Sequence, residues 1–194
     1  MAIGPDLQAV LSEATRLLSR AVADRRSPMH TPTIATVAAD GRPRLRTVVL
    51  RGFDTARREL RFHTDARSPK VAEMTAEPRI GIHVYDPGAK VQIRVDATVS
   101  LHADGGIADN AWLTSQPMSR VCYATRPAPG SPIGEGGSFS LPANPQEVET
   151  GRANFVAVIA RIDALEWLHL AQTGHRRACF SWTGDDCEGT WLAP

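Results

Sequence analysis

Basic residues are concentrated in residues 44–70, in a chain whose formal net charge is only +1. Arg46 and Arg51 bracket the apolar run 47–50 in a segment with the composition of a strand. A buried arginine is costly unless it meets an anion, and phosphate oxygens match the two-pronged guanidinium. The pattern indicates a phosphate site, with an exposed strand face or carboxylate partners as the open alternative. Their spacing places the two arginines on opposite faces of a regular strand.

A second candidate for anion binding follows within the same basic stretch. His63-Thr64 ends a predicted strand, and Ser68-Pro69-Lys70 opens a predicted helix. The unpaired N–H groups and the dipole of a helix start both favour negative charge, and a lysine adds to them. An ordinary serine N-cap without a ligand is the alternative.

The other reactive side chains lack the spacings of known metal or hydrolase sites. The six histidines form no HxxxH or HExxH pattern, and the three cysteines form no CxxC pair. Gly134–Gly137 lacks the lysine of a phosphate loop, and no serine lies in a G-x-S-x-G turn. Cys122 and Cys179 lie in apolar surroundings that raise a thiol pKa. We expect no metal site, and the sequence identifies no catalytic residue.

Short strands must position these residues. An amphipathic helix is predicted at about 6–25, a second at 68–77, a third at 104–116, and an extended loop at 126–145. Strands are predicted at 32–38, 44–53, 59–64, 79–86, 90–101, 154–163, 164–171 and 177–183. Tight turns without intervening helices favour an antiparallel barrel over a βαβ fold. The fold class is therefore mainly β with flanking helices.

Length and composition narrow the class of protein further. A chain of 194 residues fits a single domain, 1–194, and the small net charge argues against nucleic-acid binding. No apolar run is long enough for a membrane span, and the N-terminus MAIGPDLQAV lacks the features of a secretory signal. The scattered cysteines suit a reducing cytoplasm. We expect a cytoplasmic protein without a membrane or nucleic-acid partner.

An ordered set of motifs resembles the FMN-binding signature of the pyridoxamine 5'-phosphate oxidase family. R-x-V-V-L-R at 46–51, F-H-T at 62–64 and S-P-K at 68–70 stand where that family has R-x-V-L-L-K, F-Y-T and S-R-K. Further similarities follow at Gln92 in KVQIRV, at RPAPGS from Arg126 to Ser131, and in the closing segments EWLHL, GHRRACF and WLAP.

The resemblance implies a split β-barrel that forms a homodimer, with FMN between the subunits. It implies that Arg46, Ser68 and Lys70 hold the FMN phosphate, and that Gln92 binds the cofactor from the second subunit. Trp167 (or Leu168, depending on register) and one of Arg176 and Arg177 would close the site. The remaining implied cofactor contacts are Thr47, Val48, Val49, Arg51, His63 and Thr64.

The implied substrate side departs from the family more than the cofactor side. It comprises Arg51, Arg126, Ser131, His175 and Arg177. Pro69 removes one phosphate-binding arginine, for which Arg67 could substitute; Cys122 stands in place of a tyrosine, Cys179 replaces an arginine, and the order of His175-Arg176-Arg177 is reversed.

The resemblance therefore predicts an FMN-dependent oxidoreductase that oxidises a small, possibly phosphorylated, amine or alcohol with O2. The altered substrate side leaves two alternatives. One is a flavin- or haem-binding split-barrel protein without oxidase activity, and the other is a flavin reductase.

Overall fold

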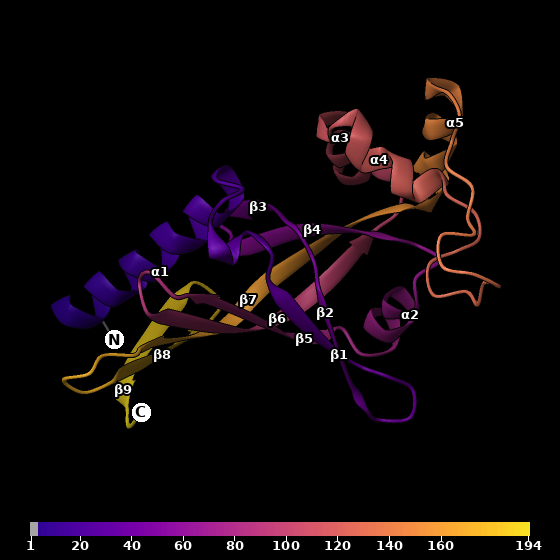
Figure 1. Ribbon diagram of the computed structural model, residues 1–194. Helices are drawn as coiled ribbons and strands as arrows, with labels where there is room; N and C mark the ends of the chain where they lie inside the picture. The colour runs from indigo at the N-terminus through magenta and orange to yellow at the C-terminus, as the bar shows by residue number, and fades with distance from the viewer. Residues whose placement is uncertain (1–3) are drawn as a thin grey trace.

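An open, antiparallel sheet forms the body of the protein in a computed structural model that describes residues 4–194 (Figure 1). Its strand order is β2-β1-β5-β6-β7-β4-β3, and β8 and β9 continue from β7. The strands are β1 Thr33–Val37, β2 Pro43–Thr47, β3 Leu50–Asp54, β4 Glu59–Asp65, β5 Arg79–Asp86, β6 Val91–His102, β7 Phe155–His169, β8 Arg176–Thr183 and β9 Asp186–Leu192. The predicted class, mainly β with flanking helices, is confirmed. Within residues 4–194 the sheet does not close, because β2 and β3 at its two ends are not paired.

The segment 44–53 is two strands, so the prediction of a single strand was wrong. β2 pairs with β1, whereas β3 pairs with β4 at the other end of the sheet. The chain crosses between them at Val48 and Val49, where the Val48 N–H donates to the Pro32 carbonyl at 2.9 Å. Arg46 and Arg51 therefore belong to different strands, and the expectation of opposite faces on one strand does not apply.

The long strand β7 replaces the two strands predicted at 154–163 and 164–171. It pairs with β6 over most of its length, and the register shifts between Asp96 and Ala97. The irregularity lies beside Asp163, whose carboxylate accepts a hydrogen bond from Thr98 Oγ1 at 2.6 Å. A bulge of this kind bends a strand without ending it, so the period-2 pattern is interrupted while the strand continues.

Helix α1 (Pro5–Ala23) confirms the predicted amphipathic helix, and it packs on β3, β7, β8 and β9. Its buried stripe consists of Val10, Ala14, Leu17, Leu18 and Ala21. A short 3-10 turn, η1 (Pro28–His30), leads into β1. None of the helices within residues 4–194 combines the length and the apolar character that a membrane span requires. Residues 1–3, part of the segment that argued against a signal, lie outside the described residues.

A second group of helices covers the N-terminal end of β7 (Figure 1). It comprises α3 (Gly105–Thr114), α4 (Pro117–Ala124), α5 (Pro145–Glu149) and the 3-10 turn η2 (Thr150–Asn154). Trp112, Tyr123 and Phe155 pack edge to face and form the centre of a small separate core. Only the first of these helices is predicted from the sequence, because the others are short and depend on this packing.

Candidate functional site

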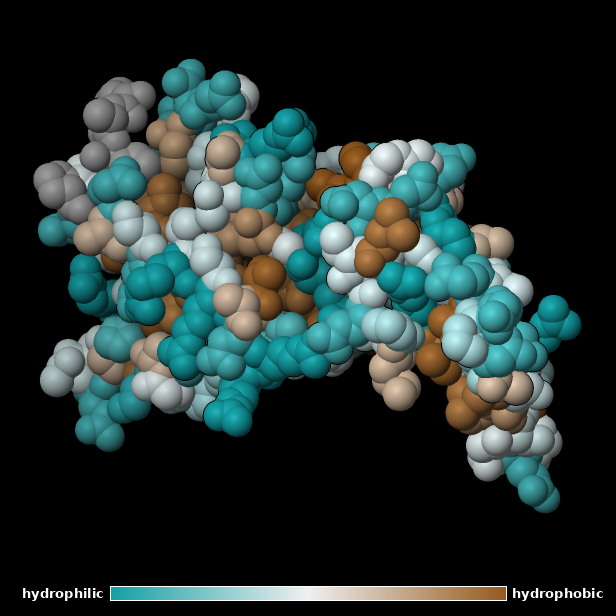
Figure 2. Space-filling model, turned by 90° about the horizontal axis from the view of Figure 1, so that it is seen from above, coloured by the Kyte–Doolittle hydropathy of each residue, from teal (hydrophilic) through white to brown (hydrophobic). Residues whose placement is uncertain are grey.

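A cavity of about 390 Å³ lies where the β2–β3 crossing meets β4, α2 (Pro69–Ala76) and α4. The residues that line it are Thr47, Val48, Val49, Arg51, His63, Thr64, Asp65, Lys70, Met118, Ser119, Cys122, Tyr123 and Pro129. Seven of the predicted cofactor-binding residues are thus brought together in one place. The face of the molecule seen from above is mostly hydrophilic, with separate apolar patches over the body and over the helical end (Figure 2).

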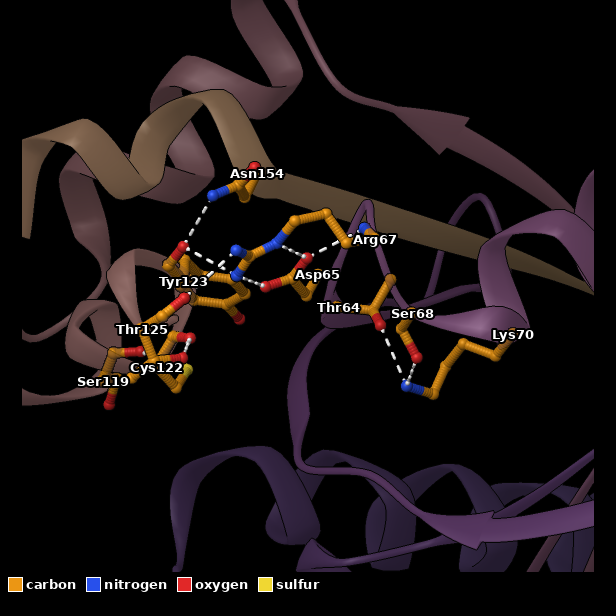
Figure 3. Close-up of polar contacts among 10 residues, drawn as sticks. All are labelled: Thr64, Asp65, Arg67, Ser68, Lys70, Ser119, Cys122, Tyr123, Thr125 and Asn154. Carbon is orange, nitrogen blue, oxygen red and sulfur yellow. Dashed lines mark hydrogen bonds and ion pairs between the residues drawn. The ribbon is translucent and has the colours of Figure 1, made fainter. Parts of the chain in front are cut away.

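Lys70 lies at the start of α2 among buried hydroxyl groups (Figure 3). Its Nζ donates to Ser68 Oγ at 2.7 Å and to Thr64 Oγ1 at 3.2 Å. Ser68 occupies the N-cap position as predicted, but its side chain makes no capping hydrogen bond to the helix. Burial, reinforced by the positive charge of Arg46, lowers the pKa of Lys70. The arrangement combines a cation, two hydroxyls and a helix start, which together can hold an anion.

Arg46 is close to this group but does not line the cavity. Its Nη2 forms an ion pair with Glu73 Oε2 at 2.8 Å, and its Nη1 donates to the Thr36 hydroxyl and to the Arg44 carbonyl oxygen. The open alternative, in which the strand arginine meets a carboxylate, therefore describes Arg46. Arg51, in contrast, lines the cavity directly.

His63 presents a neutral imidazole to the cavity. Burial, together with the charges of Arg61 and Arg51, lowers the pKa of His63 to about 3. The ring packs against Phe155 with 4.7 Å between centroids, and the buried Nε2 has no hydrogen-bond partner among the described residues. A buried polar atom without a partner beside a cavity is a place where a ligand atom can bond.

Arg67 has a structural role next to the site. Its guanidinium pairs with Asp65 at 2.6 Å and also donates to the carbonyl oxygens of Tyr123 and Thr125 (Figure 3). These bonds tie the end of β4 to the C-terminal end of α4. Because most of its N–H groups are occupied in this way, Arg67 does not take the place of the missing phosphate-binding arginine.

Helix α4 supplies lining residues that the sequence analysis did not assign to the site. These are Met118, Ser119, Cys122 and Tyr123. Desolvation by neighbouring atoms raises the pKa of the Cys122 thiol, as predicted, although the residue as a whole is exposed. Burial raises the pKa of the Tyr123 phenol. The signal available in the sequence was Pro117 following Gln116, a helix-start pattern.

The other predicted cofactor residues lie at the opposite end of the sheet. Gln92 pairs with Leu168, and Leu168 pairs with Arg177, so these three share one face. Trp167 belongs to the opposite face, is 3% exposed and borders α1. Thr64 pairs with Val156, which is about 40 Å along β7 from Leu168 at roughly 3.3 Å per residue. Within one protomer these groups cannot touch a ligand in the cavity.

The predicted substrate residues also separate into groups. Arg126 and Ser131 lie on an exposed loop outside the cavity, which that loop reaches only through Pro129. His175 is exposed at the far end of the sheet, where Arg177 forms an ion pair with Glu166 at 2.7 Å. Only Arg51 of this set lines the cavity.

The open sheet and the cavity at its β2–β3 crossing define a protein of the split-barrel class. Residues 12–103 match the model of the pyridoxamine 5'-phosphate oxidase FMN-binding domain. This part of the chain is similar to the pyridoxamine 5'-phosphate oxidase-like family, and the match confirms the resemblance seen in the sequence motifs. The match ends before α3, so the similarities noted beyond residue 103 stay predictions.

Curated relatives share this part of the chain. A pyridoxine/pyridoxamine 5'-phosphate oxidase of Rubrobacter xylanophilus is 36% identical over 115 residues, which cover 59% of this chain and 46% of the relative. The corresponding oxidase 2 of Arabidopsis thaliana is 32% identical over 107 residues, covering 51% of this chain and 53% of the relative. The chain thus spans about half the length of these relatives.

Solved structures support the fold over the whole chain. A pyridoxamine 5'-phosphate oxidase-related, FMN-binding protein from Nostoc punctiforme superposes with a TM-score of 0.76 at 24% identity, covering 100% of both chains. PhzG from Burkholderia lata, solved with tetrahydrophenazine-1-carboxylic acid, gives a TM-score of 0.74 at 20% identity, covering 100% of this chain and 98% of that one. At these identities the similarity establishes the split-barrel fold alone.

Proposed function

We propose that the chain binds FMN in the cavity formed by the β2–β3 crossing, α2 and α4. The phosphate would lie at the start of α2, beside Lys70 and Ser68, and the ring would run along Val48, Val49 and His63. The observation that carries this proposal is the meeting of a buried Lys70–hydroxyl group with the unpaired His63 Nε2 in one cavity. One offers charge to a phosphate and the other a hydrogen-bonding atom to a polar ring edge.

A second copy of the chain would complete this site. Gln92, Leu168 and Arg177 share one face but lie too far along β7 to reach the cavity of their own protomer. In a homodimer with two-fold symmetry the far end of one sheet can lie over the cavity of the other. Trp167 faces α1 instead, which favours Leu168 as the residue beside the flavin. Glu166 holds the Arg177 guanidinium at 2.7 Å on this face.

The proposed activity is that of an oxidoreductase acting on a small, possibly phosphorylated, amine or alcohol. When bound, FMN supplies the redox chemistry by accepting a hydride from the substrate and passing the electrons to O2. Arg51 supplies a positive charge in the cavity for an anionic substrate group. The raised pKa of Tyr123 keeps its phenol protonated and able to donate a hydrogen bond at neutral pH. The neutral His63 adds no charge beside the ring.

Purified protein tests the proposal in two stages. A yellow preparation whose absorbance matches bound flavin, and which releases FMN on denaturation, is the expected result. Oxygen consumption with pyridoxamine 5'-phosphate or pyridoxine 5'-phosphate then tests the oxidase. Protein that takes up no FMN contradicts the binding proposal, and a Soret band would instead identify the haem-binding alternative.

A flavin-binding protein with another substrate, or without oxidase activity, is the second candidate. The position of Arg126 and Ser131 favours it, because both lie outside the cavity on the exposed loop. FMN-loaded protein that consumes no oxygen with either vitamin B6 phosphate would support this candidate over the first. A screen of amine and alcohol donors, followed by flavin bleaching under anaerobic conditions, would then identify the reductant.

A further inference from the structure

Glu73 connects α2, which begins at the proposed phosphate site, to the strands β1 and β2. It lies on α2, and its Oε2 accepts hydrogen bonds from Arg46 Nη2 on β2 and from the Thr36 hydroxyl on β1. Arg46 Nη1 donates to the same hydroxyl. Glu73 and Arg46 have side-chain exposures of 12% and 23%, and Thr36 is buried. Three separate elements thus meet in one compact polar group.

This group leaves one edge of the Arg46 guanidinium available. A guanidinium has five N–H groups. Nη1 donates to Thr36 and to the Arg44 carbonyl, and Nη2 donates to Glu73. The Thr36 hydroxyl bonds to both Nη1 and Glu73, so the hydroxyl and the carboxylate together occupy the end of the guanidinium that carries the two terminal nitrogens. Nε–H and the second N–H of Nη2 have no partner among residues 4–194, and together they form the side edge, whose two-donor geometry matches two phosphate oxygens.

Arg46 and Lys70 also form a pair of neighbouring cations. The charge of Arg46 contributes to the lowered pKa of Lys70, while Glu73 acts on Lys70 in the opposite direction. A carboxylate between two cations reduces their repulsion and fixes the longer side chain, which otherwise loses rotamer entropy on binding. Glu73 therefore acts on both members of the pair.

We propose that Glu73 is a positioning residue for phosphate recognition, which holds Arg46 through Thr36 so that its free edge is presented beside Lys70. The inference rests on the proposed FMN function. It assigns to Glu73 the selection of phosphorylated over unphosphorylated flavin. Glu73 does not touch the ligand itself.

The test compares the affinities of FMN and riboflavin, measured by flavin fluorescence titration, in wild type and variants. Glu73→Ala should weaken FMN by about tenfold or more, the scale of a hydrogen bond to a charged group, and leave riboflavin unchanged. Glu73→Gln keeps an oxygen for Arg46 and should retain most of the preference for FMN. Glu77→Gln is the matched control, because Glu77 lies at the C-cap of the same helix and pairs with Arg79 instead of Arg46, and it should change neither affinity.

Thr36→Val provides a second route, because it removes the hydroxyl that joins Glu73 to Arg46 and should reduce the same FMN-to-riboflavin preference. Thermal unfolding of each variant reports whether the fold is kept. If Glu73→Ala and Thr36→Val keep or increase the wild-type preference for FMN, Glu73 is not a positioning residue. If wild type binds neither flavin, the proposed function fails, and the role of Glu73 fails with it.

Discussion

At the scale of single residues, Lys70 is the cation most directly placed for a phosphate. Its Nζ donates hydrogen bonds to two buried hydroxyls. Lys70 also lines the cavity, whereas Arg46 does not. We expect Lys70→Ala to weaken FMN binding by roughly ten- to a hundredfold, since hydrogen bonds to charged groups contribute about 1.5–3 kcal/mol. Isothermal titration with FMN and with riboflavin measures the effect, which should be confined to FMN. Equal losses for both flavins would place the phosphate elsewhere.

His63 makes a separate prediction about pH. Its folded pKa of about 3 is below the ordinary value of 6.5, so the unfolded chain binds the extra proton between these values. Stability is therefore fully present above pH 6.5 and is lost as the pH falls towards 3, by up to about 1.4 kcal/mol per pH unit. Urea unfolding at pH 7 and pH 5 should show a smaller loss for His63→Asn than for wild type.

The control for this measurement is His175→Asn, which removes an exposed imidazole from the far end of the sheet. It should leave the wild-type difference between pH 7 and pH 5 intact. A His63→Asn variant with that same difference would show that the His63 imidazole is not held neutral in the folded protein.

At the scale of elements, the docking of α4 depends on a close approach at Gly151. A Cβ at this position would lie 2.9 Å from the Ala124 nitrogen and 3.1 Å from Tyr123 Cβ. Gly151→Ala should therefore destabilise the fold by about 1–3 kcal/mol, as overpacking does, and loosen the α4 wall of the cavity. Urea unfolding and hydrogen exchange across residues 117–124 report the two effects. Gly134→Ala, with no atom within 4 Å of the added Cβ, should change neither.

At the scale of the whole molecule, the proposed dimer predicts complementation between variants. Arg177→Ala and Lys70→Ala should each weaken FMN binding, because they remove contacts from the two sides of one shared site. Mixed dimers formed from the two variants contain one intact site and should recover tight FMN binding. Arg176→Ala is the matched control, since Arg176 pairs with His169 on the face opposite Arg177 and packs over Trp191.

Size-exclusion chromatography with light scattering gives the oligomeric state for the same samples. A monomeric wild-type protein that binds FMN tightly would contradict the shared site. If the protein is dimeric, an Arg177→Ala variant that binds FMN with unchanged affinity would also contradict the shared site.

The sequence by itself determined the elements that depend on local patterns. The apolar stripe of α1, the Ser68-Pro69-Lys70 start of α2 and the alternation of β5 and β6 follow from side-chain periodicity and backbone preference, so they were predictable. The ordered motifs between Arg46 and Lys70 were enough to indicate the family resemblance, which the match over residues 12–103 confirms. Seven of the predicted cofactor residues meet in the cavity because they are close in sequence to the crossing or to the start of α2.

Only the tertiary structure decided which of those residues can act together. The strand is interrupted at Val48 and Val49 because β2 and β3 pair with strands at opposite ends of the sheet. No local sequence pattern indicates this pairing. The pairing of Arg46 with Glu73, the commitment of Arg67 to Asp65 and the formation of α4 over Phe155 are contacts between distant segments. The separation of Gln92 and Arg177 from the cavity follows from the length of β7. Because these residues cannot reach the cavity of their own protomer, a second copy of the chain is the proposed source of their contacts with the flavin.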